Sequence, residues 1–63
     1  MYRVQITGTN SKGKTSYDRE EQFISYESMR RVLGKEITEK LVSEGIADEF
    51  NEDEKVYYEF TLL

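Results

Sequence analysis

The absence of both cysteine and histidine most constrains what this chain of 63 residues can fold into. Domains of this size are marginally stable, and many are held together by disulfide bonds or by a structural metal. Without cysteine or histidine, the chain can form neither a disulfide bond nor the usual structural zinc site. We therefore expect residues 1–63 to form a single small domain, stabilised by a compact apolar core or by a second copy in a homodimer.

Two segments near the ends of the chain show the two-residue alternation that is typical of β-strands. Their apolar residues are Tyr2, Val4 and Ile6 in the first segment and Val56, Tyr58, Phe60 and Leu62 in the last. Residues 15–24 are ambiguous. Tyr17 and Phe23 share the parity of a strand, whereas the polar run from Arg19 to Gln22 would also suit the start of a helix. We favour a strand that pairs with the first one as a hairpin.

The middle of the chain carries the apolar spacing of an amphipathic helix. The apolar positions are Met29, Val32, Leu33, Ile37, Leu41 and Val42. Ser25 is a suitable N-cap, because its hydroxyl can accept a hydrogen bond from a free N–H group in the first turn. Gly45 is a suitable left-handed residue at the C-terminal end. Gly34 interrupts the pattern, so one kinked helix and two short helices are both compatible with it.

These segments predict an α+β fold with the order β-β-α-β, in which a three-stranded antiparallel sheet packs on one main helix. The acidic region from Asp48 to Lys55 is predicted to be a connection before the last strand. The predicted core comprises Val4, Ile6, Phe23, Met29, Val32, Leu33, Ile37, Leu41, Ile46, Val56, Tyr58, Phe60 and Leu62. The second face of the last strand carries Tyr57 and Leu63, which makes it more apolar than contact with solvent requires.

Charge is distributed unevenly along the chain, whose net charge is −4. Residues 1–35 carry seven Lys or Arg and four Asp or Glu, whereas residues 36–63 carry two Lys and nine Asp or Glu. This asymmetry predicts a protein partner with a basic surface and argues against nucleic-acid binding, which requires a basic footprint. We find neither an apolar run long enough to span a membrane nor a signal peptide, and we therefore expect a cytoplasmic protein without a membrane partner.

The segment Gly8–Thr15 matches the phosphate-binding pattern G-x-x-x-x-G-K-[ST]. It also resembles the ATP-binding loop of the Mur ligase and folylpolyglutamate synthetase family, and the match implies that Gly13, Lys14 and Thr15 bind phosphate and Mg²⁺. Such a loop requires a helix that begins at its Lys-Ser/Thr pair, and residues 16–22 have no apolar helical stripe. We therefore interpret the segment as a glycine-containing hairpin loop, with nucleotide binding as an alternative.

The residue types argue against an enzyme. The usual general base, histidine, and the thiol nucleophile, cysteine, are both missing. The acidic residues from Asp48 to Glu54 do not form an EF-hand, because Asp53 stands where that loop needs a glycine. We therefore predict no catalytic residues, no metal site and no cofactor.

The layout of the chain resembles the small uracil-DNA glycosylase inhibitors of phi29-type Bacillus phages. The similar features are the first strand, the turn at Gly13-Lys14, a helix that opens at Ser25-Tyr26-Glu27 and reaches Val32-Leu33-Gly34, and the terminal strand. The family consists of dimeric DNA mimics, with acidic residues and an aromatic or apolar pocket at the dimer surface. The chain departs from the family in its longer acidic connection before the last strand.

The resemblance implies that Asp18 and Glu27 act as phosphate-like groups and that Tyr26 or Met29 lines the pocket, although Met29 stands where an aromatic residue is expected. The remaining predicted partner-binding residues are Asp48, Glu49, Glu52, Asp53 and Tyr57. We therefore predict a small acidic protein-binding inhibitor or regulator, such as a phage-encoded DNA mimic that inhibits a DNA-binding enzyme like uracil-DNA glycosylase. One alternative is a structural or assembly module that dimerises or adds its C-terminal strand to a partner. The other is a nucleotide-binding protein that uses Gly8–Thr15.

Overall fold

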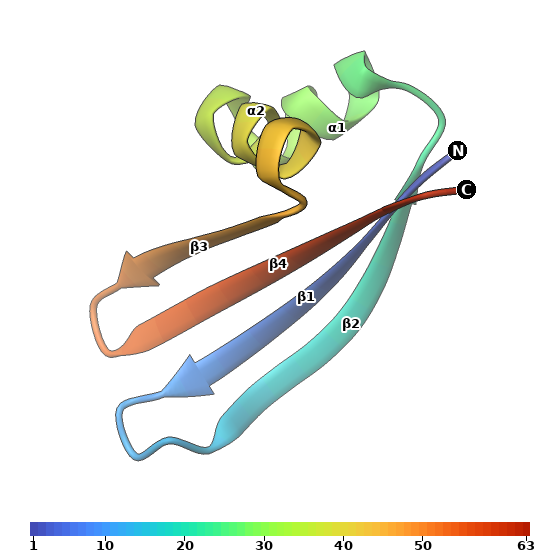
Figure 1. Cartoon of the computed structure of the whole chain (residues 1–63). Coiled ribbons are helices and arrows are strands. Elements are labelled where there is room, and N and C mark those ends of the chain that lie inside the picture. The colour runs from blue at the N-terminus through green and yellow to red at the C-terminus, as the bar shows by residue number, and fades with distance from the viewer.

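The first and last strands of the chain lie side by side at the centre of one antiparallel sheet (Figure 1). The computed structural model describes all 63 residues. Its elements are β1 (Tyr2–Asn10), β2 (Thr15–Phe23), α1 (Tyr26–Leu33), α2 (Lys35–Glu44), β3 (Ile46–Asn51) and β4 (Glu54–Leu62). The strand order is β2-β1-β4-β3, so the β1–β2 and β3–β4 hairpins are joined by the pairing of β1 with β4. No helix is both long enough and apolar enough to cross a membrane.

The fold is α+β, but the predicted three-stranded sheet on one main helix is wrong, because the sheet has four strands and the helical segment forms two helices. The predicted connection from Asp48 to Lys55 instead contains most of β3 and the turn into β4. Ala47 is the only buried residue of β3. An edge strand of this composition is stabilised by its hydrogen bonds to a neighbour and not by its own propensity, which explains why the sequence pattern did not indicate it. The prediction that residues 15–24 form a strand is confirmed by β2.

The two helices are separated at Gly34, whose φ of 91° and ψ of 162° lie in a region that is accessible almost only to glycine. Helix α1 begins at the predicted N-cap. The Ser28 N–H donates to Ser25 Oγ at 3.1 Å, and the Ser25 N–H donates to Ser28 Oγ at 3.2 Å. Helix α2 ends at Gly45, which has the left-handed conformation expected of it. The apolar spacing was compatible with one kinked helix or with two short helices, and the structure has two short helices.

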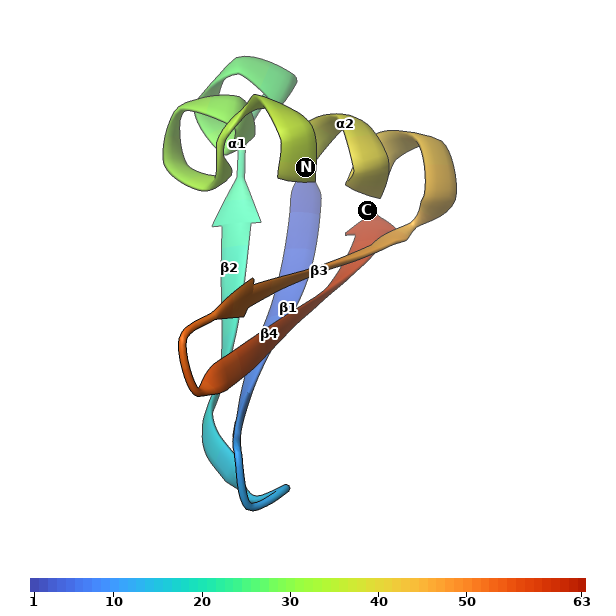
Figure 2. The ribbon, with the colours of Figure 1, turned by 90° about the vertical axis from the view of Figure 1, so that its left-hand side faces the viewer.

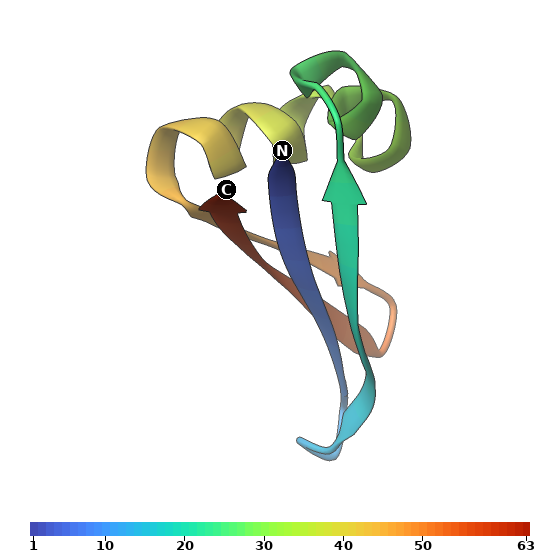
Figure 3. The ribbon, with the colours of Figure 1, turned by 90° about the vertical axis from the view of Figure 1, so that its right-hand side faces the viewer.

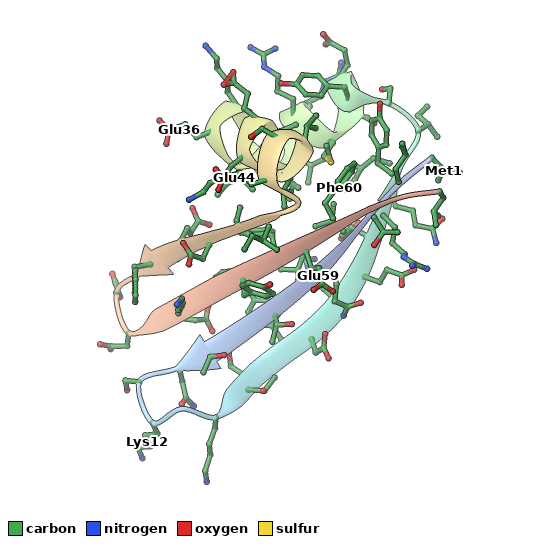
Figure 4. All side chains as sticks on the ribbon, in the orientation of Figure 1. Met1, Lys12, Glu36, Glu44, Glu59 and Phe60 are labelled. Carbon is green, nitrogen blue, oxygen red and sulfur yellow. The ribbon has the colours of Figure 1, made fainter.

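Both helices pack on the same face of the sheet, at the end where the chain termini lie, while the hairpin turns extend beyond them (Figure 2 and Figure 3). Even-numbered residues of β1 and β4 face the helices, because side chains alternate across a strand. The core there contains Val4, Ile6, Phe23, Met29, Leu41, Ala47, Val56 and Tyr58, with Tyr2, Leu33, Ile37 and Phe60 packed against it. In Figure 4, Phe60 lies between the sheet and the helices.

Three residues of the predicted core are exposed instead. The exposed fraction is 63% for Val32, 46% for Ile46 and 67% for Leu62. Val32 is exposed because α1 uses Met29 as its buried residue, and Ile46 is exposed because it lies on the side of β3 that faces away from the helices. Ala47, which was not predicted to be in the core, lies on the helix side of β3 and is buried.

We expect Gly34→Ala to destabilise the protein by about 1–3 kcal/mol, because an alanine is strained at the backbone conformation that Gly34 adopts. No atom lies within 4 Å of the position that the new Cβ would occupy, so steric overlap does not contribute to the loss. Urea unfolding followed by circular dichroism measures the change. The control is Gly45→Asn, which should lose less because asparagine tolerates the left-handed conformation. An equal loss at both positions would show that the backbone of Gly34 is not the cause.

Candidate functional site

One face of the sheet carries no helix (Figure 1). Its side chains alternate with those of the core. We call this surface the open face, and it comprises Arg3, Gln5, Thr7, Thr9, Asp18, Glu20, Gln22, Ile46, Asp48, Phe50, Lys55, Tyr57, Glu59 and Thr61. Its ionisable groups include four carboxylates, of Asp18, Glu20, Asp48 and Glu59, and two cations, of Arg3 and Lys55. The open face is therefore net negative.

Strand pairing arranges the acidic residues of the open face in rows across the sheet. One row contains Asp18, Thr7, Tyr57 and Asp48, in the order β2, β1, β4 and β3. The adjacent row contains Glu20, Gln5, Glu59 and Ile46 in the same order. Tyr57, which is 38% exposed, lies directly beside Asp48 in its row and is separated from Asp18 by Thr7, while Glu59 lies beside it on the same strand face.

Polar neighbours contact these carboxylates without covering them. Gln5 Nε2 donates a hydrogen bond to Asp18 Oδ1. Two exposed ion pairs are present, between Arg3 Nε and Glu20 Oε1 at 3.9 Å and between Lys55 Nζ and Asp48 Oδ2 at 3.7 Å. Such pairs contribute little to stability, so these carboxylates remain available to a partner. Glu59 forms no ion pair.

Apolar side chains are exposed on the β3–β4 half of the open face. Phe50 is 79% exposed, and Lys55 Nζ lies 5.6 Å from the centre of its ring. Ile46 and Tyr57 lie on the same strands and are also exposed. Aromatic side chains surrounded by charged groups are typical of protein-binding surfaces, because they bury a large apolar area on contact.

The structure brings three of the predicted partner-binding residues together. Asp18, Asp48 and Tyr57 belong to one row of the open face, although they come from three different strands. The pairing of β3 with β4 places Asp48 beside Tyr57, and the pairing of β1 with β4 brings Asp18 into the same row.

The other predicted partner-binding residues lie elsewhere. Tyr26, Glu27 and Met29 belong to α1, in the helix layer. Met29 has no exposed surface, so its side chain is not available to line a partner pocket as the resemblance implied. Glu52 and Asp53 form the turn between β3 and β4. Glu27 and Asp18 are therefore on different layers of the molecule.

Glu49, the remaining predicted partner-binding residue, forms a hydrogen bond within the protein. Its Oε1 accepts a hydrogen bond of 3.0 Å from the hydroxyl of Tyr58. Burial, followed by the hydrogen bond and the charge of Glu49, raises the pKa of Tyr58 from 10.0 to about 12.

The segment Gly8–Thr15 forms the end of a hairpin and not a phosphate-binding loop. Asn10 Oδ1 accepts hydrogen bonds from the N–H groups of Lys12 at 2.9 Å and Lys14 at 3.1 Å, and the Gly13 N–H donates to Asn10 O at 2.9 Å. The three N–H groups are thus used within the loop. A strand follows at Thr15, so the helix N-terminus that a P-loop requires is missing. The interpretation of the segment as a hairpin loop is confirmed.

Gly8 is required by packing within this hairpin. Strand pairing places it opposite Tyr17, and a Cβ atom at Gly8 would lie 2.4 Å from Tyr17 Cε1. The ring of Tyr17 therefore covers the backbone of β1 where no helix does. The glycine that begins the phosphate-binding pattern has this structural role instead.

Sequence reasoning missed Glu20, Glu59, Ile46 and Phe50 as members of the site. Side chains alternate along the last strand, so Glu59 lies on the same face as Tyr57, and the sequence pattern could have identified it. Phe50 and Ile46 were not, because β3 itself was not predicted. No group of three or more acidic side chains lies close enough together to hold a metal ion.

No protein-family model, curated protein or solved structure matches this chain. The resemblance to the phage inhibitors, which depends on Ser25-Tyr26-Glu27 and Val32-Leu33-Gly34, therefore stays a hypothesis. In the structure these residues form the N-cap and the two ends of α1.

We expect the thermal stability of the protein to fall more between pH 10 and pH 12 than that of Tyr58→Phe. The folded state favours the neutral phenol, so this contribution to stability is complete below pH 10.0 and is lost as the pH rises to about 12. Thermal unfolding across this range measures the difference, and tyrosinate absorbance locates the pKa. Glu49→Gln should lower the pKa of Tyr58, because it removes the neighbouring charge. Identical pH profiles for wild type and Tyr58→Phe would contradict the assignment.

We expect Asn10→Ala to lower the free energy of unfolding by about 1 kcal/mol, because two backbone N–H groups lose their acceptor. Asn10→Asp retains an acceptor oxygen and should lose less. Lys14→Ala changes the neighbouring exposed side chain and should have little effect. Urea unfolding compares the variants, and the role assigned to the Asn10 side chain is refuted if Lys14→Ala costs as much as Asn10→Ala.

Proposed function

We propose that the protein is a small, non-catalytic inhibitor or regulator that binds the basic surface of another protein through its open face. The observation that carries the proposal is the row of Asp18, Tyr57 and Asp48, with Glu20 and Glu59 in the adjacent row. Carboxylates around exposed aromatic side chains combine electrostatic attraction to a basic target with apolar contact.

A DNA-binding enzyme is the favoured class of target. Neighbouring strands of a sheet are about 4.8 Å apart, so Glu20 and Glu59, on strands two positions apart, are separated by about 10 Å at the backbone. The corresponding separation of Asp18 and Asp48, three positions apart, is about 14 Å. These separations are comparable to the width of the DNA major groove, about 12 Å. The open face therefore supports a DNA mimic of the kind that inhibits uracil-DNA glycosylase.

The proposal places the binding surface on the sheet and not on α1. The resemblance implied contributions from both Asp18 and Glu27, which the fold separates into different layers. Glu27 has a basic environment, because it lines a surface hollow with Arg30, Arg31 and Lys35. Such a surface repels a basic target, so Asp18 is retained in the proposed site and Glu27 is not.

The test is uracil excision by a purified bacterial uracil-DNA glycosylase with increasing amounts of the protein, at low and at high salt. We expect wild type to inhibit at low salt and Glu59→Lys to weaken inhibition by at least about tenfold, because it reverses a charge at the centre of the open face. The matched control is Glu39→Lys, the same change on α2, which should inhibit as wild type does.

Glu27→Lys tests the alternative that the binding surface lies on α1 and not on the open face. If it abolishes inhibition while Glu59→Lys does not, the open face is not the binding surface. If this enzyme is not inhibited, capture of DNA-binding enzymes from bacterial lysate at low salt would keep the wider class of target. Failure of both inhibition and capture would reject the inhibitor proposal.

A second candidate is an assembly module, favoured by the exposed side chains of Ile46, Phe50 and Tyr57. Addition of the C-terminal strand to a partner is not compatible with the fold, because both edges of β4 are paired, with β1 and with β3. A homodimer would instead use the apolar part of the open face. Its association would persist at high salt, whereas binding to a basic partner would weaken, and sedimentation at two salt concentrations separates the two candidates.

A further inference from the structure

Strand β3 has an unpaired edge. It is the last strand of the order β2-β1-β4-β3 and pairs only with β4. The Phe60 N–H donates to Gly45 O at 2.9 Å, and hydrogen-bonded pairs alternate along an antiparallel ladder. The N–H and C=O groups of Ile46, Asp48 and Phe50 therefore point away from β4, toward solvent. Their side chains belong to the open face.

A groove runs along this edge between β3 and α2. A hollow of about 100 Å³ is lined by Lys40, Glu44, Ile46, Ala47, Asp48 and Tyr57. A larger hollow of about 500 Å³ reaches from the start of α2 to Asp48 and Glu49. Figure 2 shows β3 in front of the sheet with α2 above it, and Figure 4 shows Glu36 and Glu44 on α2. A free strand edge beside a helix is the arrangement in which several domains bind an extended peptide as an additional strand.

The other free edge of the sheet is better protected. Strand β2 carries the charged run from Asp18 to Glu21, and its pairing with β1 is interrupted by a bulge near Gly8. Charged side chains and bulges are the usual means of preventing strand addition. Strand β3 has no bulge and has two exposed apolar side chains, Ile46 and Phe50. It is therefore the edge that more readily accepts a new strand.

A second copy of the same strand does not fit this edge. Antiparallel pairing of β3 with itself about its centre would place Asp48 opposite Glu49, and Glu49 opposite Asp48. Parallel pairing in register would place each carboxylate beside its own copy. Like charges directly opposite each other destabilise a sheet, so self-pairing is disfavoured.

The charges beside the groove favour a basic occupant. Glu36, Glu44 and Glu49 lie along it on the helix side, and Asp48 projects from β3 on the open face. The lysines here, Lys35 and Lys40 of α2 and Lys55, which pairs with Asp48, leave this set net negative. An added strand would direct alternate side chains toward the acidic helix side and toward Ile46 and Phe50 on the open face. A sequence that alternates basic and apolar residues satisfies both sides.

We propose that an extended segment of the partner, with alternating basic and apolar residues, pairs with the free edge of β3 as a fifth strand. This inference rests on the proposed function in taking the partner to be basic. It adds backbone hydrogen bonds to Ile46, Asp48 and Phe50 as the mode of attachment.

The probe is the peptide acetyl-Lys-Val-Lys-Val-Lys-Val-Lys-amide, titrated into the full-length ¹⁵N-labelled protein. We expect amide hydrogen exchange of Ile46, Asp48 and Phe50 to slow by at least about tenfold, because their exposed N–H groups become hydrogen-bonded. Amides along the outer edge of β2 should not change. An analogue with Glu in place of Lys should not bind, and a peptide N-methylated at the groups that would face β3 should bind at least about tenfold more weakly.

A variant of the protein provides a second test. The Asp48 N–H points to solvent, so Asp48→Pro preserves the ladder with β4 and blocks pairing at the edge. We expect this variant to retain its circular dichroism spectrum and to bind the peptide at least about tenfold more weakly than Asp48→Ala, which loses the same charge but keeps the N–H. If it does not fold, the N-methylated peptide still tests the pairing in the wild type.

Strand addition is overturned if the peptide does not bind, or if N-methylation makes no difference and the peptide instead shifts the resonances of Asp18 and Glu59. The second result would leave the proposed function standing, since the basic peptide would then occupy the open face. Protection of the β3 edge without any inhibition of a DNA-binding enzyme would support the strand pairing and count against the inhibitor.

Discussion

The structure depends on the pairing of the first strand with the last. Strands β1 and β4 run side by side from the pair Tyr2–Leu62 to the pair Asn10–Glu54, and each also carries one hairpin partner on its outer side. Without this ladder, the chain would consist of two isolated two-stranded hairpins, which are marginally stable in water. The ladder also aligns Val4 and Ile6 with Phe60 and Tyr58; Val4, Ile6 and Tyr58 belong to the buried core, and Phe60 packs against it. In a chain without disulfide bonds, it supplies the long-range connection between the two halves of the sequence.

The same ladder creates the open face. Both helices connect β2 to β3, which are the outer strands, and they cross the sheet on one side only. The opposite side therefore remains uncovered, and its side chains come from all four strands. The acidic second half of the chain contributes Asp48 and Glu59 to it, while the first half, which is basic overall, contributes Asp18 and Glu20. Although charge is distributed unevenly along the sequence, the fold places carboxylates from both halves of the chain on one acidic surface.

The sequence predicted the features that depend on local chemistry. The alternation of Tyr2–Ile6 and of Val56–Leu62 identified the two central strands, and Ser25 and Gly45 identified the ends of the helical segment. The hairpin at Gly8–Thr15 was also interpreted correctly, because the residues after it lack a helical pattern. Strand β3 was missed, because its short sequence combines two acidic residues with three apolar ones that do not follow a two-residue alternation, and its position is determined by hydrogen bonds to β4. The site was only partly predictable for the same reason. Asp18 and Tyr57 share a row only through the register of β1 with its two neighbours, and Met29, which was placed both in the core and at the binding surface, is in the core.

The closeness of the two chain ends has a consequence for the order in which the protein acquires its structure. The Leu63 N–H donates to Met1 O at 2.9 Å, so the central ladder extends to both termini. During synthesis, β1 is made before β4 and remains without its central partner until β4 has also left the ribosome. The β1–β2 hairpin, α1 and α2 depend on local hydrogen bonds and can form before that point. Pairings between distant parts of a sequence are slow to form, because the intervening loop must be closed before they stabilise the chain. The pairing of β1 with β4 is therefore among the last steps in completing this sheet, and β1 lacks the neighbouring core side chains Val56 and Tyr58 until it forms.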